Sequence, residues 1–154
     1  MVTNPNIIDL ESSIGPWLGK TVKMVDYYVQ ESFKENNIDL TKEQAIILKV
    51  LSEKGSQNQN ELACSTFRDK SSLARLLSTM ENKKYIVRKP DKDDKRINNV
   101  SITKLGESIN HKSLPLIREV VTTMQQNISE KDIKNTIKIL QKIQSNLTTE
   151  VHSF

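Results

Sequence analysis

The spacing of apolar residues changes near Tyr85, from a helical period to the alternating period of a β-strand. Before the change, a segment that Asp69 can cap carries apolar side chains at helical spacing, namely Leu73, Leu76, Leu77 and Met80. After it, two β-rich runs, 85–89 and 97–102, enclose a polar tip at 91–96. An isolated hairpin is only marginally stable, so the pattern predicts an antiparallel hairpin packed on a helical core.

Three more helices are predicted before the Asp69 helix. Gly15-Pro16 can start the first helix, and Asn36-Asn37 can end it. The second helix starts at a capping box, Thr41 to Gln44, and stops at Gly55. Another box, Asn58 to Glu61, starts a helix that can last only about two turns. The expected fold class is therefore mainly α with a small β-hairpin.

Two amphipathic helices are predicted after the hairpin. Thr103 caps the first of them, and Pro115 in its interior predicts a kink or a break. The last helix starts at Ser129 and carries a narrow apolar stripe made of Ile133, Ile137, Leu140, Ile143, Leu147 and Val151. Because the core does not need these stripes, we expect the end helices to pack together and against a second copy. A helical extension that folds back on its own core is the alternative.

Positive charge is concentrated in one part of the chain. Residues 68–104 contain eleven Lys and Arg against five Asp and Glu, a local net charge of +6, whereas the whole chain carries +4. A clustered basic patch attracts polyanions such as nucleic acid, although a solvated charged face would have the same composition.

The remaining composition favours a binding protein of the cytoplasm. A length of 154 residues suits a single domain, and we expect neither a signal peptide nor a membrane partner. Cys64 is the only cysteine, and with His111 and His152 it gives too few ligands for a metal site, so no cofactor is expected. No paired-carboxylate, nucleophile–base or Gly-rich phosphate motif rises above chance, so we expect no catalytic residues and no enzyme.

The exposed side of the Asp69 helix offers candidate contacts to DNA. A recognition helix presents short polar and cationic side chains to base edges in the major groove. Arg75 is the best candidate for a bidentate contact to guanine, and its neighbours would contact bases or phosphates: Lys70, Ser71, Ser72, Ser78 and Thr79. An ordinary amphipathic surface helix would explain the same pattern, but not the hairpin beside it.

The hairpin tip, 91–96, mixes both signs of charge. Its cations, Lys92, Lys95 and Arg96, can contact the DNA backbone or enter a narrow minor groove. We expect Asp94 or Asp91 to pair with Arg96 and hold the loop. A solvated turn without a ligand is the alternative.

The segment from Glu61 to Glu107 resembles the MarR (multiple antibiotic resistance regulator) family of bacterial winged helix-turn-helix regulators. The most specific motifs are DKDDKR at 91–96, which resembles the D-x-x-D-x-R wing, and TKLG at 103–106, which resembles the T-x-x-G helix start. The resemblance implies a single domain over 1–154, with a DNA-binding lobe at 41–102 and dimerisation helices at 8–37 and 103–154. It further implies a homodimer with two recognition helices in successive major grooves and two wings in the flanking minor grooves.

The chain departs from the family at the turn before the recognition helix, where Thr66-Phe67-Arg68 replaces a leucine-glycine-apolar sequence. Arg68 is therefore expected to reach a phosphate instead of packing inward. Family members often bind small aromatic anions between the dimer base and the DNA-binding lobe, and the residues here that could line such a site are Trp17, Tyr27, Tyr28 and His111. Ordinary core or surface packing is the alternative for each of them.

Some members of the family sense oxidants through a cysteine in the first helix. Cys64 lies instead in the short third helix, where a small buried residue is a sufficient explanation. The function that the sequence favours is a dimeric, sequence-specific DNA-binding regulator, a repressor whose affinity for a pseudo-palindromic operator is lowered by a small effector. A winged-helix module that binds protein without binding DNA is the alternative.

Overall fold

The computed structural model describes residues 9–66 and 68–147. Phe67 and, near the C-terminus, Val151 and His152 lie outside the described residues. The elements in chain order are α1 (Ile14–Glu35), α2 (Lys42–Lys54), β1 (Gln57–Asn58), α3 (Gln59–Thr66), α4 (Lys70–Asn82), β2 (Ile86–Pro90), β3 (Asn98–Ile102), α5 (Lys104–Met124) and α6 (Glu130–Leu147). The predicted fold class, mainly helical with a small hairpin, is confirmed.

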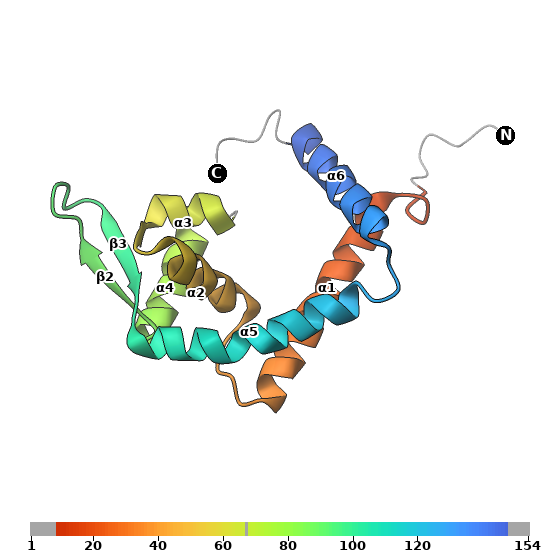
Figure 1. The fold of residues 1–154 in the computed structure, drawn as a ribbon. Helices are drawn as coiled ribbons and strands as arrows, with labels where there is room; N and C mark the ends of the chain where they lie inside the picture. Colours follow the sequence, from red (N-terminus) through yellow and green to blue (C-terminus); the bar gives the residue numbers. More distant parts are fainter. Residues whose placement is uncertain (1–8, 67, 148–154) are drawn as a thin grey trace.

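Figure 1 shows two regions joined by α5. The hairpin of β2 and β3 projects from α2, α3 and α4 at one end, and α5 runs from the hairpin to α1 and the start of α6. The hairpin corresponds to the wing and α4 to the predicted recognition helix.

Local capping signals start the helices where the sequence places them. The Thr41 Oγ1 accepts from the Gln44 N–H at 3.2 Å, while the Gln44 Oε1 accepts from the Thr41 N–H at 3.2 Å. At α4, the Asp69 Oδ1 accepts from the Ser72 N–H at 2.8 Å. Each bond satisfies a backbone donor that the first helical turn leaves without an internal partner.

The sheet has one strand more than predicted. Its order is β1-β3-β2 and both pairings are antiparallel, with Val100 of β3 opposite Gln57 of β1 and opposite Arg88 of β2. The strand β1 is two polar residues long, and it has no apolar alternation from which it could be predicted. Its pairing with β3 connects the base of the wing to the start of α3.

One hydrophobic core holds together the predicted DNA-binding lobe at 41–102. Its completely buried side chains come from α2, α3, α4 and the sheet, and they include Ile47, Leu48, Leu62, Leu73, Leu77, Met80 and Val100. Val29 and Phe33 of α1 and Val120 of α5 extend this core toward the other region. The apolar face predicted for α4 is confirmed, with Leu76 partly buried at its edge.

The helix α5 is continuous through Pro115, so the predicted break does not occur. Pro115 is exposed, and partly buried apolar residues on both sides of it, Ile109, Leu116 and Ile117, pack against the core. This packing keeps the helix intact although proline cannot donate to the carbonyl one turn earlier.

The start of α5 is locked against the start of the wing. The Thr103 hydroxyl donates to the Lys84 carbonyl oxygen at 2.6 Å and accepts from the Gly106 N–H at 3.0 Å. A Cβ atom at Gly106 would lie 2.1 Å from the Tyr85 carbonyl oxygen, so only glycine fits there. These contacts give the T-x-x-G motif a physical meaning.

The helix α6 buries none of its residues in the protomer. Ile137, Ile139 and Leu147 are 48%, 55% and 69% exposed. Figure 1 shows α6 standing away from the DNA-binding lobe. Of the stripe residues that the structure describes, Ile133, Leu140 and Ile143 are partly buried, whereas Ile137 and Leu147 are exposed.

Candidate nucleic-acid interface

The exposed face of α4 carries most of the predicted recognition residues. Lys70, Ser71, Arg75 and Thr79 are exposed, whereas Ser72 and Ser78 are partly buried. The Arg75 guanidinium has neither an ion-pair nor a hydrogen-bond partner among the described residues. The Thr79 hydroxyl donates to the Arg75 carbonyl oxygen at 3.2 Å, which leaves its lone pairs free. This face therefore holds a free cation beside short polar side chains.

Arg68 and Ser72 contact each other at the start of α4. The Arg68 Nη1 donates to the Ser72 Oγ at 2.8 Å, and its Nη2 lies 3.9 Å from the Glu43 Oε1 of α2. In this structure the guanidinium braces α4 against α2. A phosphate contact by Arg68 or Ser72 would have to share or replace these bonds, and such a contact stays a prediction.

Arg88 of β2 braces the wing against the C-terminal half of α4. Its Nε and Nη2 donate to the Glu81 Oε2 at 3.0 and 2.6 Å, and its backbone N–H donates to the Glu81 Oε1 at 3.1 Å. The same Nη2 donates to the Ser78 Oγ at 3.2 Å. These hydrogen bonds, above all the one from the Arg88 side chain, lower the pKa of Glu81 below its ordinary value. The sequence analysis did not find this brace.

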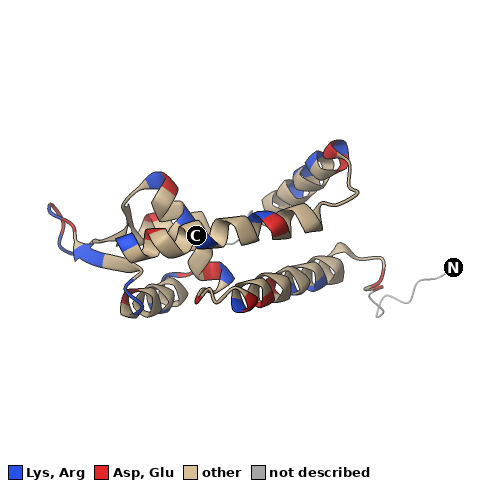
Figure 2. Ribbon diagram, turned by 60° about the horizontal axis from the view of Figure 1, so that its bottom comes forward, with Lys and Arg blue, Asp and Glu red and all other residues tan. Residues whose placement is uncertain are grey.

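Two aspartates organise the wing tip. The Asp91 Oδ1 accepts from the N–H groups of Asp93 and Asp94 at 2.9 and 3.2 Å, and its Oδ2 accepts from the Asn99 Nδ2 at 2.7 Å. These bonds, led by the one from the Asp93 N–H, lower the pKa of Asp91. Figure 2 shows basic residues along the hairpin and both signs of charge at its tip.

The predicted ion pair of Arg96 with Asp94 or Asp91 is wrong. The Asp94 Oδ1 accepts from the Arg96 backbone N–H at 3.0 Å. The Arg96 guanidinium forms no ion pair within the part of the chain that the structure describes. Both carboxylates instead fold the loop through backbone and amide hydrogen bonds, which leaves this cation exposed beside Lys92 and Lys95.

A hollow of about 290 Å³ separates the wing from α3 and α4. Lys70 of α4 and Arg96 of the wing, which were predicted separately, both line it. Its other polar lining residues, Gln59, Asn60 and Asn98, were not predicted as site residues. Sequence spacing gives no signal for them because the fold brings them together from three separate elements.

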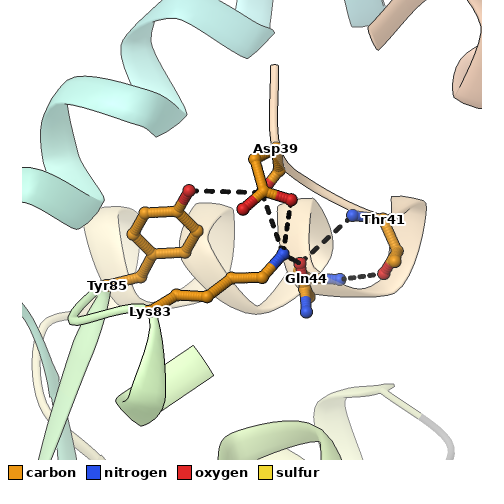
Figure 3. Close-up of polar contacts among 5 residues, drawn as sticks. All are labelled: Asp39, Thr41, Gln44, Lys83 and Tyr85. Atoms are coloured by element: carbon orange, nitrogen blue, oxygen red, sulfur yellow. Dashed lines mark hydrogen bonds and ion pairs between the residues drawn. The ribbon is translucent and has the colours of Figure 1, made fainter. Parts of the chain in front are cut away.

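A cluster of polar contacts joins the end of α4 to the loop between α1 and α2 (Figure 3). The Lys83 Nζ donates to the Asp39 Oδ1 at 2.7 Å and lies 3.4 Å from the Gln44 Oε1. The Tyr85 hydroxyl donates to the Asp39 carbonyl oxygen at 3.2 Å, and burial raises the pKa of Tyr85. This cluster connects the position of α4 with that of α1.

Two of the four residues predicted to line an effector site, Tyr27 and Tyr28, lie along the same groove of the described protomer. Tyr27 and Tyr28 lie with Lys20 and Lys23 along an open groove of about 650 Å³ on α1, and Tyr27 is 69% exposed. Trp17 is 60% exposed, its Nε1 donates to the Glu11 carbonyl oxygen at 3.1 Å, and the Lys20 Nζ lies 5.9 Å from its ring centre. His111 is exposed on α5 and does not line this groove.

A second cavity, of about 180 Å³, lies where α1, α2 and α5 meet. Phe33, Ala45 and Val120 contribute to its apolar wall, and Lys42 and Lys49 also line it. Both lysines have acidic partners: Lys42 pairs with Asp26, and the Lys49 Nζ lies 2.7 Å from the Glu53 Oε1. The sequence analysis missed this cavity because its wall is assembled from ordinary core residues of three helices.

Metal binding and membrane insertion are two further possibilities for the described residues, 9–66 and 68–147. No cluster of His, Cys, Asp or Glu in these residues could hold a metal ion, and none of their helices is long and apolar enough to cross a membrane. Cys64 is exposed rather than buried as expected, because Leu62 and Ala63 occupy the inward face of α3.

Comparisons with known proteins place this fold. No curated protein matches the chain. BpsR from Bordetella bronchiseptica, whose DNA binding is regulated by 6-hydroxynicotinic acid, has a similar structure, with a TM-score of 0.82, 15% identity, and coverage of 90% of this chain and 97% of that chain. AbsC, a MarR family transcriptional regulator from Streptomyces coelicolor, has a TM-score of 0.80 at 22% identity, with coverage of 92% and 96%.

A mutant MarR from E. coli complexed with operator DNA has a TM-score of 0.72 at 24% identity, with coverage of 88% of this chain and 99% of that chain. Residues 40–98, which span the DNA-binding lobe up to the start of β3, match the model of the MarR family. Residues 40–98 are therefore similar to the MarR family of transcription regulators, and the chain shares its overall fold with AbsC and with the mutant MarR.

Proposed function

We propose that this protein is a sequence-specific regulator that binds duplex DNA through α4 and the wing. The observation that carries the proposal is the unpaired Arg75 on the exposed face of a helix whose position is fixed at both ends. At one end Asp69 caps the helix, and at the other Glu81 is bound by Arg88 of the wing. The helix therefore holds the backbone of Arg75 in a fixed position, from which its exposed guanidinium can reach a guanine base edge.

The wing supplies affinity in this proposal. Its free cations, Lys92, Lys95 and Arg96, contact the backbone or the minor groove, while Lys70, Ser71 and Thr79 contact bases or phosphates beside Arg75. Phosphate contacts of this kind fix the register of a protein on DNA but discriminate poorly between sequences. Base discrimination then rests on α4.

We propose that the active form is a homodimer assembled by the regions 8–37 and 103–154. The support is apolar side chains that are each at least 41% exposed: Ile137 and Leu147 of α6, Trp17 and Met24 of α1, and Val121 of α5. Apolar surface of this extent is stabilised when it is covered by a symmetric copy. A two-fold dimer would present two α4 helices to a pseudo-palindromic operator. We propose that the protein acts on this DNA in the bacterial cytoplasm.

The proposed response to an effector uses the cavity between α1, α2 and α5. A small aromatic acid could place its ring against Phe33 and Val120 and its carboxylate near Lys42 or Lys49. Filling this space would displace α2, which belongs to the DNA-binding lobe, from α1 and α5, which belong to the dimer region. The affinity for the operator would fall, which is the behaviour of a ligand-responsive repressor.

Selection of duplexes from a random library by the purified protein tests the proposed function. We expect enrichment of a pseudo-palindromic sequence that the protein binds at least 1,000-fold more tightly than a scrambled duplex, the lower end of about 10³–10⁷ for specific regulators. Failure to enrich any sequence, combined with salt-resistant capture of a protein partner, would favour the protein-binding alternative.

The effector proposal has its own test. Ala45→Leu narrows the cavity from the α2 side, so it should suppress the release of DNA that 6-hydroxynicotinic acid or a related aromatic acid causes in the unchanged protein. Operator affinity without the acid should stay the same, because Ala45 is buried away from the exposed face of α4. Equal release from both proteins would show that the acid acts elsewhere.

A further inference from the structure

Five polar side chains around the hollow between the wing, α3 and α4 are available to a ligand. In the described chain, the side chains of Gln59, Asn60, Lys70 and Asn98 have no hydrogen-bond or ion-pair partner, and neither does the guanidinium of Arg96. All five line the hollow, and its apolar floor includes Leu73 and Ala74. Most of the surrounding polar side chains are engaged: Asn58 and Glu61 cap α3, Asp91 binds Asn99, and Arg88 binds Glu81.

The lining of the hollow is suited to an anion with several oxygen acceptors. Lys70 and Arg96 contribute two cations from different elements, and the three amides contribute N–H donors. No carboxylate is among the residues described as lining it. Three acidic side chains that lie one or two residues from the lining residues in sequence accept backbone hydrogen bonds: the Asp69 Oδ1 from the Ser72 N–H, the Glu61 Oε2 from the Asn58 N–H, and the Asp94 Oδ1 from the Arg96 N–H.

We propose that this hollow is a phosphodiester clamp for the DNA strand that runs between the groove entered by α4 and the groove entered by the wing. The inference rests on the proposed DNA binding and adds Gln59, Asn60 and Asn98 to the interface. A backbone strand separates the major from the minor groove of a duplex. With α4 in one groove and the wing in the other, that strand passes over the residues that lie between them. Two cations and three amides at that place bind its phosphate oxygens.

The charged and the neutral groups of the clamp contribute differently to the salt dependence of DNA binding. Lys70 and Arg96 release counterions when they meet phosphate, so they contribute to the salt dependence of binding. The amides of Gln59 and Asn60 donate hydrogen bonds without releasing counterions. Their removal therefore weakens binding and leaves the slope of log affinity against log salt unchanged.

The test combines variants of α3 with a duplex that carries single neutral methylphosphonates. We expect the double variant Gln59→Ala/Asn60→Ala to bind the selected operator about 5- to 30-fold more weakly, which corresponds to the loss of about one hydrogen bond per protomer of the dimer. A methylphosphonate at the clamped phosphate should weaken the unchanged protein more than it weakens this variant, in which only Lys70, Arg96 and Asn98 can still contact that phosphate. Gln126→Ala, which removes an exposed amide from the loop between α5 and α6, is the matched control and should bind normally.

Asn60→Asp separates the clamp from a folding defect. A carboxylate in the first turn of α3 favours the helix, yet it repels phosphate, so this variant should fold normally and bind DNA more weakly than Asn60→Ala. The clamp would be overturned if the loss of affinity in the double variant and the loss caused by a methylphosphonate were additive at every backbone position. Unchanged DNA binding by the double variant would also overturn it. If the unchanged protein binds no duplex at all, the proposed function fails, and the clamp fails with it.

Discussion

Replacing Gly106 with alanine should disrupt the joint between the wing and α5. The added Cβ would lie 2.1 Å from the Tyr85 carbonyl oxygen and 2.9 Å from the Ile102 Cγ1, so backbone must move. Overpacking of this kind costs about 1–3 kcal/mol. Movement of the joint also weakens the hydrogen bonds of the Thr103 hydroxyl, each worth about 1 kcal/mol. The better helix propensity of alanine returns about 1 kcal/mol, so the net loss in the free energy of unfolding is about 2 kcal/mol.

Urea unfolding followed by circular dichroism measures this loss, at one protomer concentration because association contributes to stability. Gly19→Ala is the matched control: it also lies inside a helix, but nothing lies within 4 Å of its added Cβ. This control should be more stable than the unchanged protein by about 0.5–1 kcal/mol. The close approach at Gly106 is refuted if both substitutions change stability by the same amount.

Three further predictions concern the brace, the dimer and the charge of the interface. Glu81→Gln should lower the free energy of unfolding at neutral pH. The difference between the two proteins should vanish as the pH falls through the lowered pKa of Glu81, because the unchanged protein then loses its stabilising carboxylate too. A difference that persists in acid would contradict the brace. Light scattering on the intact protein should give about twice the chain mass of 17.6 kDa, and a monomeric mass would contradict the dimer. Deletion of 127–154 should give monomers or aggregates. Log affinity for DNA should fall linearly with log salt, with a slope equivalent to roughly 6–10 released counterions per dimer, and salt-independent binding would contradict the phosphate contacts.

Local signals explain how much of the fold could be predicted from the sequence. Thr41, Asp69 and Thr103 each cap a helix with their own side chain, and such short-range chemistry is legible in a single sequence. The position of α4 and its buried face followed from the same reasoning. The effect of Pro115 did not, because tertiary packing of α5 overrides the local preference for a break.

Contacts between distant elements could not be predicted in this way. Glu81 and Arg88 lie on a helix and a strand whose relative orientation is set by the core, so no periodicity aligns them. The hollow gathers residues from α3, α4 and the wing, and the cavity at the base of the lobe gathers core residues from three helices. The sequence identified free cations such as Arg75 and Arg96 but not the neutral amides that share their surface.

The central claim is that α4 reads sequence while the wing adds affinity. Arg75→Ala and Arg96→Ala, both verified as folded by circular dichroism, should be titrated by fluorescence anisotropy against the selected operator and a scrambled duplex at one salt concentration. We predict that Arg75→Ala costs about 1–3 kcal/mol per half-site on the operator and much less on scrambled DNA, whereas Arg96→Ala weakens both more evenly. An operator-to-scrambled ratio that Arg75→Ala leaves unchanged would contradict the account.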